Sequence, residues 1–148
     1  MSVATWADVD KIQVGDTASC VMTVTAEQVD TFARLSLDDN MIHMDDAAGR
    51  AAGFPGRIAH GMLALSAISR LIGTQLPGHG SLWMSQDVQF AAPVLIGDRV
   101  EARVTVEQVS RAAQAVVLRT EAMNPDTGAV ILRGTARVRV PPRKAEGA

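Results

Sequence analysis

The architecture of this chain follows from one long apolar run, Gly61-Met62-Leu63-Ala64-Leu65-Ser66-Ala67-Ile68-Ser69-Arg70-Leu71-Ile72-Gly73-Thr74-Gln75-Leu76. Its large apolar residues fall on almost every side of a helix, and Arg70 carries its only charge. A helix that is apolar nearly all round is normally buried in a protein core. The Pro77-Gly78 pair that follows is typical of a helix end. We therefore predict one buried helix over residues 61–76.

Strand patterns follow this helix, over residues 82–90, 99–107, 115–123 and 130–140. In the second and fourth stretches, apolar residues alternate with charged or hydroxyl residues, which is typical of an antiparallel strand with one buried face. The first stretch would place Leu82, Met84, Val88 and Phe90 on one face. The third is more apolar, as in a central strand. The turn signal Asn124-Pro125-Asp126-Thr127-Gly128 separates the last two strands.

Shorter features precede the apolar helix. Residues 17–25 are rich in β-branched side chains and predict a strand. Thr25-Ala26-Glu27-Gln28 fits the pattern of a capping box and predicts a helix over 26–36. Residues 37–60 have no clean period beyond a short turn of helix around 46–52, and such long irregular stretches are usually functional or disordered. One sheet curling around one buried helix satisfies this order, so we predict an α+β fold.

Length and composition limit the class of protein. The 148 residues favour a single domain over 1–148, whose polar tail over 141–148 should fray. The net charge of −2 argues against a nucleic-acid partner, and the single cysteine, Cys20, favours a reducing compartment. The N-terminus lacks the pattern of a signal peptide, and no apolar stretch reaches the roughly 20 residues of a spanning helix. We expect a soluble, cytoplasmic protein with no membrane partner.

One candidate site is the stretch Asp38-Asp39-Asn40-Met41-Ile42-His43. A carboxylate and an imidazole five positions apart on an irregular segment can converge on one water molecule, and such a pair supplies a base and a proton donor near neutral pH. The alternative is a solvated acidic loop with a surface histidine, since both residue types are common in loops. Spacing alone leaves both interpretations open.

A second candidate lies at Pro55-Gly56-Arg57-Ile58-Ala59-His60-Gly61-Met62, where the apolar helix begins. A glycine lets a ligand approach the backbone, and the first N–H groups of a helix have no intrahelical partners. Such a terminus can bind an anion or a developing oxyanion. Alternatively, Gly61 only eases the turn into the helix, and His60 is a cap or a packed core histidine.

Other groups carry weaker hypotheses. Two histidines and one carboxylate could imitate a metal site, but no compact metal-ligand spacing supports it, and we predict no metal. Its members would be His43, His60 and either Asp38 or Asp45. Cys20, within a strand, is better explained as a small buried hydrophobe than as a nucleophile. The basic strand residues Arg133, Arg137 and Arg139 would be solvated or would meet an anionic ligand such as a CoA phosphate.

Together these motifs resemble the MaoC-like, (R)-specific enoyl-CoA hydratase family. Asp38-x-Asn40-x-x-His43 and Phe54-Pro55-Gly56-Arg57-Ile58-Ala59-His60-Gly61-Met62 are similar to its hydratase signature. Three later runs match the family's usual pattern: Gln75-Leu76-Pro77-Gly78-x-Gly80, Phe90-x-x-Pro93-Val94 and Gly97-Asp98. Met41 departs from it, because the family commonly has proline there. The resemblance covers about residues 12–140, which we take as the core of a single MaoC-like domain.

The resemblance implies the hot-dog fold, an antiparallel sheet wrapped around a long central helix, usually in a homodimer. It also implies reversible syn hydration of a trans-2-enoyl-CoA to the (R)-3-hydroxyacyl-CoA, with acyl-CoA as substrate and without a cofactor. Asp38 and His43 would then be the catalytic pair that holds the water, and the Gly61 backbone N–H would hold the thioester oxygen. The supporting residues would be Asn40, Ser69 and His60.

Two other functions stay open at this stage. A hot-dog acyl-CoA thioesterase would use one carboxylate and would not need the paired histidine of Asp38-x-Asn40-x-x-His43. A non-catalytic acyl-CoA-binding module would keep the fold, but would not need Asp38, Asn40, His43 and Gly61 all intact. Release of free CoA would distinguish the first, and binding without turnover the second.

Overall fold

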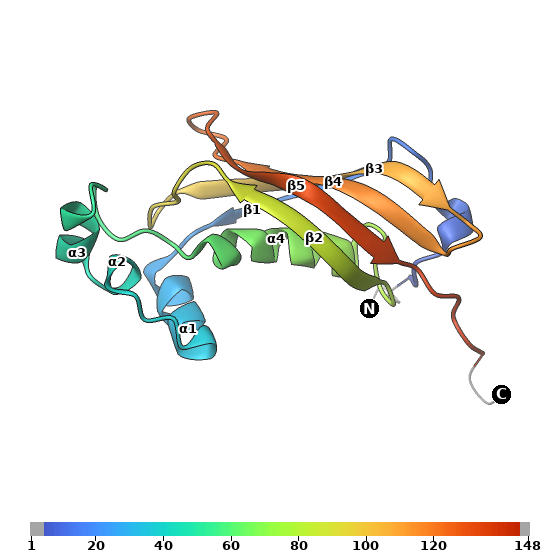
Figure 1. The fold of residues 1–148 in the computed structure, drawn as a ribbon, viewed down its shortest axis with the longest axis horizontal. Helices are drawn as coiled ribbons and strands as arrows, with labels where there is room; N and C mark the ends of the chain where they lie inside the picture. Colours follow the sequence, from blue (N-terminus) through green and yellow to red (C-terminus); the bar gives the residue numbers. More distant parts are fainter. Residues whose placement is uncertain (1–4, 146–148) are drawn as a thin grey trace.

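The computed structural model describes residues 5–145 as one antiparallel sheet with a long helix against one face (Figure 1). The elements in chain order are η1 (Val9–Lys11), β1 (Thr17–Thr23), α1 (Ala26–Ser36), α2 (Met41–Met44), α3 (Asp46–Ala51), α4 (Gly61–Thr74), β2 (Leu82–Phe90), β3 (Arg99–Ser110), β4 (Ala115–Met123) and β5 (Val130–Arg139). The α+β class is confirmed. Residues 141–145 belong to no helix or strand, and residues 146–148 of the expected tail lie outside the described residues.

All strand pairs in the sheet are antiparallel, and the strand order is β1-β3-β4-β5-β2. Along β4, and along β3 as far as Val106, every second side chain is buried, so one face of the sheet is apolar and the other is charged. Leu118 at the centre of the sheet lies opposite Val106 of β3 and Ala136 of β5, and all three are buried. The alternation predicted for residues 99–107 is therefore confirmed, whereas that predicted for residues 130–140 is interrupted at its start, where Val130 is exposed and Ile131 and Leu132 are both buried.

Helix α4 lies along the apolar face of the sheet (Figure 1). Ile68 and Leu71 are completely buried on the side of α4 that packs against the core. The opposite side is exposed at Met62, Ser66 and Ser69, so the prediction of a helix buried on every side is wrong for the single chain. The reason is that the sheet covers one side only, while α1 lies beside the first part of the helix (Figure 1).

The edge strand β2 differs from its predicted pattern. A register shift lies between Trp83 and Ser85, which reverses the alternation of side chains along the strand. As a result Leu82 and Met84 are exposed, at 51% and 60%, whereas Trp83 is partly buried in the core. Leu82 and Met84 therefore do not share the inner face with Val88, and that part of the prediction is wrong. Simple period-two reasoning cannot anticipate a bulge.

Most helix boundaries agree with the sequence. Helix α1 occupies the predicted residues, and its capping box is formed: the Thr25 hydroxyl accepts from Gln28 N–H, and the Gln28 side chain accepts from Thr25 N–H. Helix α3 corresponds to the expected helical turn, whereas α2 was not predicted, because four residues are too few to show a period. Among the residues described, no helix combines the length and hydropathy needed to cross a membrane.

Candidate active site

The two residues of the proposed acid–base pair lie on the short connection between α1 and α2 and on α2 itself. Helix α1 ends at Leu37, whose φ of 61° is left-handed and turns the chain sharply into Asp38. The Asp38 carboxylate accepts from the N–H of Asn40 at 3.3 Å, and Asn40 in turn caps α2 by accepting from Ile42 N–H at 3.3 Å. These local bonds start α2 at a fixed point, and α2 then carries His43.

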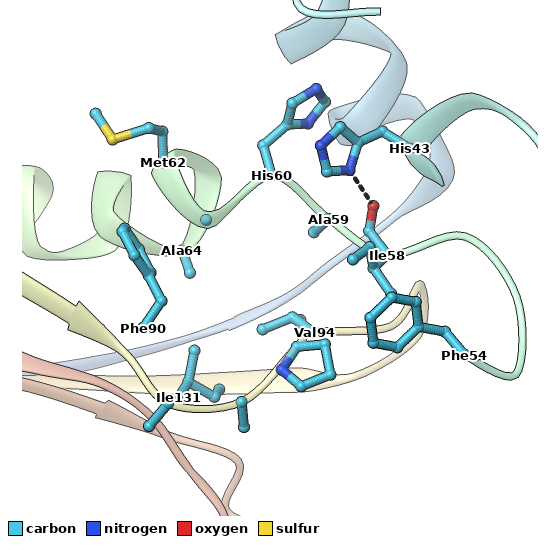
Figure 2. Close-up of a pocket in the computed structure, with 14 residues that line it drawn as sticks. His43, Phe54, Ile58, Ala59, His60, Met62, Ala64, Phe90, Val94 and Ile131 are labelled. Carbon is cyan, nitrogen blue, oxygen red and sulfur yellow. Dashed lines mark hydrogen bonds between the residues drawn. The ribbon is translucent and has the colours of Figure 1, made fainter. Parts of the chain in front are cut away.

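The ring of His43 is held in one tautomer. Its Nδ1 lies 2.7 Å from the carbonyl oxygen of Ile58 (Figure 2). Because a carbonyl oxygen only accepts, Nδ1 must carry the proton, which leaves Nε2 of the neutral ring with a free lone pair. The residue is buried, with 8% of its surface exposed. His43 is therefore prepared to accept a hydrogen bond or a proton at Nε2.

His60 is the residue immediately before α4, and its ring lies beside that of His43. Its Nε2 is 2.9 Å from the backbone oxygen of Asp38, so Nε2 carries the proton there as well. Its ring centroid lies 3.9 Å from that of His43 and 4.7 Å from that of Phe32, with the ring planes tilted by 30° and 47°, so three rings from three parts of the chain pack together. The remaining nitrogen, Nδ1, is buried without a hydrogen-bond partner. His60 thus contacts both residues of the proposed catalytic pair.

Arg57 holds α1 and α2 together behind these rings. Its Nε donates to the backbone oxygen of His43 at 2.6 Å, and its Nη2 lies 2.5 Å from a carboxylate oxygen of Asp30 in α1. Its backbone N–H donates to Asp46 of α3 at 2.9 Å. Gly49 permits this arrangement, because a Cβ there would lie only 2.1 Å from the backbone oxygen of Gly56. The irregular segment is therefore rigidly cross-linked.

A pocket of about 450 Å³ opens beside the histidines, at the start of α4 (Figure 2). Its wall is mostly apolar and consists of His43, Phe54, Ile58, Ala59, His60, Gly61, Met62, Ala64, Phe90, Ala91, Ala92, Pro93, Val94 and Ile131. Gly61 is the first residue of α4, so its N–H has no intrahelical partner, and within residues 5–145 it donates no other hydrogen bond. The pocket therefore combines an apolar wall with a free backbone donor.

Asp38, His43 and His60 converge on one point at this end of α4. One nitrogen or oxygen atom from each lies within 4.8 Å of the other two. Two atoms that share one water lie about 4.6 Å apart, given hydrogen bonds of about 2.8 Å at a tetrahedral angle. This spacing is compatible with one water molecule held between the carboxylate and an imidazole.

The other candidate residues lie away from this point. Ser69 is exposed on the outer side of α4, where no described hydrogen bond joins it to Asp38 or His43. Asp45 caps α3 through Ala47 N–H instead of facing the histidines. Burial raises the pKa of the Cys20 thiol, although the Arg70 charge partly opposes this, and a raised pKa makes a poor nucleophile. The basic strand residues Arg133, Arg137 and Arg139 are exposed.

Sequence reasoning overlooked two residues of the site. Arg57 stood within the quoted motif without a role, although its guanidinium joins Asp30 of α1 to the backbone of His43. Phe32 received no role, and nothing in the sequence around it indicated a contact with His60. Both depend on how α1 packs against residues 57–60, which one sequence does not reveal.

Comparison with known proteins identifies the family of this chain. Residues 13–124 match the family described as MaoC like domain. The chain belongs to this family. The MaoC-like match includes Asp38, His43, His60 and Gly61, so all four candidate site residues lie within the matched region.

Two curated MaoC-like relatives are similar over most of their length. The chain is 39% identical to the (R)-specific enoyl-CoA hydratase of Rhodospirillum rubrum, across 90% of this chain and 92% of that protein. It is 37% identical to the (R)-specific enoyl-CoA hydratase of Aeromonas caviae, across 88% and 96%. Both relatives carry the same name, and neither contains a large additional region.

Solved structures confirm the hot-dog fold. The (R)-hydratase of A. caviae involved in PHA biosynthesis superimposes with a TM-score of 0.84 at 37% identity, covering 88% of this chain and 98% of that one. The R-hydratase PhaJ1 of Pseudomonas aeruginosa, in its unliganded form, also gives a TM-score of 0.84, at 29% identity over 96% and 94%. The sheet and central helix of this MaoC-like chain are therefore those of the (R)-hydratases.

Proposed function

We propose that this protein catalyses the reversible (R)-specific hydration of trans-2-enoyl-CoA to (R)-3-hydroxyacyl-CoA. The observation that carries the proposal is the convergence of the Asp38 carboxylate and His43 beside an apolar pocket at the free N–H of Gly61. The names of the two curated relatives and of the two superimposed structures support the same activity. The substrate is an acyl-CoA thioester.

The tautomer of His43 determines how water would be held. The free lone pair on Nε2 and the Asp38 carboxylate are both acceptors, so a water between them donates one proton to each. One lone pair of its oxygen is then free to attack C3 of the enoyl group. As the O–C3 bond forms, the C2–C3 π electrons move toward the thioester, the water loses one proton to the pair, and the pair delivers a proton to C2.

The Gly61 N–H would stabilise the charge that develops on the thioester oxygen. This donor is fixed at the start of a long helix, whose N-terminal end favours negative charge. The apolar wall of the pocket suits an acyl chain and excludes water from the enolate-like intermediate. Water, an acid–base pair and one backbone donor complete the atom balance, so the proposed reaction requires neither a metal nor a redox cofactor.

We further propose that the working unit is a homodimer. The outer side of α4 is exposed, and the edge strand β2 presents Leu82, Met84 and Phe90 with more than half of their surface accessible. An exposed apolar edge strand is normally covered or paired in a native protein. A second copy would bury these residues. It would also cover the exposed side of α4, so that Ser69 would lie in an enclosed site. The single cysteine supports a reducing compartment such as the cytoplasm.

The decisive experiment measures crotonyl-CoA hydration by loss of the conjugated thioester absorbance. Asp38→Asn removes the carboxylate, and His43→Asn keeps a donor for Ile58 near the position of Nδ1 but removes Nε2. Each should lower kcat by about 10²–10⁴-fold while the protein stays folded. Asp39→Asn, at the exposed neighbouring position, is the matched control and should retain activity. Near wild-type turnover in either catalytic variant refutes the mechanism.

The same assay distinguishes the alternative functions. A thiol reagent added to the reaction reports free CoA, which a thioesterase releases and a hydratase does not. Tight acyl-CoA binding with neither absorbance loss nor CoA release would indicate a non-catalytic binding module. Chiral analysis of the hydrated product should give the (R) enantiomer only, and a racemic or (S) product contradicts the proposal.

A further inference from the structure

We infer that His60 is a positioning residue that sets the spacing between Asp38 and His43 through one hydrogen bond, from its Nε2–H to the Asp38 backbone oxygen. The inference rests on the proposed function, because spacing matters only if the two residues share a water. It assigns a specific task to a histidine that takes no part in the proton transfers of the mechanism above. The task follows from three features of the structure.

The first feature is that Asp38 is held through its main chain. The residue is exposed, and its carboxylate accepts only the local bond from Asn40 N–H among the described residues. The bond from His60 Nε2 to the Asp38 oxygen, 2.9 Å long, spans 22 positions of sequence and ties the end of α1 to the start of α4. Among the described hydrogen bonds, this one joins Asp38 to the segment that carries Gly61.

The second feature is that His60 itself cannot easily turn. Its ring packs against the rings of Phe32 and His43, which are tilted by 47° and 30° from it, and 3% of the residue is exposed. The same contact helps to confine the ring of His43, whose one described ring hydrogen bond is made by Nδ1. His60 therefore contacts His43 through its ring and Asp38 through Nε2, so a shift of His60 changes both contacts.

The third feature is the unpartnered Nδ1 of His60. A buried polar atom without a partner is costly, and native proteins rarely keep one without a reason. Phenylalanine would fill the same space without this cost, and a residue that served only packing would not need nitrogen. The donor at Nε2 is what phenylalanine lacks, so the hydrogen bond to Asp38 explains why a histidine occupies this position.

Three substitutions of His60 separate the hydrogen bond from the rest of the ring. The amide nitrogen of glutamine lies two bonds beyond Cγ, as Nε2 of histidine does, so His60→Gln can keep a donor to the Asp38 oxygen. The amide nitrogen of asparagine lies one bond beyond Cγ, as Nδ1 does, so in His60→Asn the donor is too short to reach the Asp38 oxygen. His60→Phe keeps a packed ring and loses both nitrogens. His79→Gln, at the far end of α4, is the matched control for replacing a histidine by glutamine.

Hydration of crotonyl-CoA should fall in kcat by about 10–100-fold in His60→Phe and His60→Asn, with KM changed less than about threefold, because a misplacement near 1 Å costs about 10² in rate. His60→Gln should recover at least about fivefold in kcat over both, and His79→Gln should match wild type. A rise in KM with unchanged kcat, or an asparagine variant more active than the glutamine variant, overturns the inference. If His60→Phe does not fold, the asparagine and glutamine variants alone decide.

Hydrogen exchange gives a readout that does not depend on activity. Residues 38–44 should exchange faster in His60→Asn than in wild type, because the start of α2 loses its tie to α4, and His60→Gln should restore slow exchange. Equal exchange in all three proteins overturns the inference. If wild type does not hydrate enoyl-CoA at all, the proposed function fails, whereas the exchange result still tests the link from His60 to Asp38.

Discussion

Replacing Gly61 by alanine would test the oxyanion role without removing a functional side chain. A Cβ at Gly61 would lie 2.9 Å from Cε1, 3.0 Å from Cδ1 and 3.2 Å from Cζ of the Phe90 ring. Ordinary carbon contacts begin near 3.4 Å, so the ring must retreat by 3.4 − 2.9 = 0.5 Å. Phe90 is 51% exposed, so the ring can move outward instead of straining the helix.

This substitution should therefore be mild for stability and severe for catalysis. Moving a half-exposed ring costs about 1 kcal/mol, at the low end for overpacking, and changes Tm by about 2–4 °C at this chain length. The new methyl group and the displaced ring both lie on the pocket wall beside the Gly61 N–H. Displacing the thioester by even half an ångström should lower kcat/KM for crotonyl-CoA by about 10–100-fold.

Gly73→Ala is the matched control on the same helix. Gly73 is exposed, and a Cβ there would meet no atom within 4 Å. The change should raise stability by about 0.5–1 kcal/mol, the usual gain from alanine over glycine in a helix, and should leave kcat/KM unchanged. Thermal unfolding and the absorbance assay on both variants complete the test. A Gly61→Ala enzyme with at least half of wild-type kcat/KM would refute the oxyanion assignment.

Three further predictions concern stability and reactivity. Gly49→Ala should destabilise the protein by about 2 kcal/mol or more in urea unfolding, because its Cβ would lie 2.1 Å from the backbone oxygen of Gly56, which cannot swing aside; wild-type stability would contradict this packing. Cys20 should react slowly with iodoacetamide at pH 7 and faster above pH 9, since burial raises the thiol pKa; alkylation at pH 7 as fast as that of free cysteine would disagree. The Arg99 guanidinium lowers the pKa of Asp126. The ion pair therefore stabilises the fold at pH values above the usual pKa of an aspartate, and this stabilisation is lost as the pH falls through the lowered pKa. Asp126→Asn should therefore lower Tm at pH 7 and have no effect near pH 2, and an equal effect at both would exclude the ion pair as the cause.

The sequence predicted those parts of the fold whose cause is local. Helix α1 has its capping box within four residues, and β4 alternates along its whole length, so their positions could be derived from neighbouring side chains alone. The start of β5 could not, because Val130 is exposed while Ile131 and Leu132 are both buried. The bulge in β2 could not be derived, because it depends on pairing with β5. The exposed side of α4 was missed for a related reason. An apolar helix is expected to be buried, but its sequence does not show whether the sheet of the same chain or a second chain covers it.

For the candidate site, the sequence proposed a set of residues and not their arrangement. Spacing placed Asp38 and His43 near one another, and the resemblance to (R)-hydratases selected them from the other acidic and imidazole groups. The tautomer of His43 depends on the backbone oxygen of Ile58, 15 positions away, and the ring contact with His60 depends on the packing of α1. Such contacts have no signature in a single sequence, because a backbone oxygen is available at every position.

The proposed catalytic pair lies within a single stretch of six residues, Asp38 to His43, and this has a consequence for genetics. If two chains assemble, each brings both halves of its own acid–base pair. A chain damaged at Asp38 and another damaged at His43 would then not rescue each other when co-expressed, because no mixed assembly contains an intact stretch. An intact chain paired with a damaged one would still carry one working pair, so such alleles should be recessive.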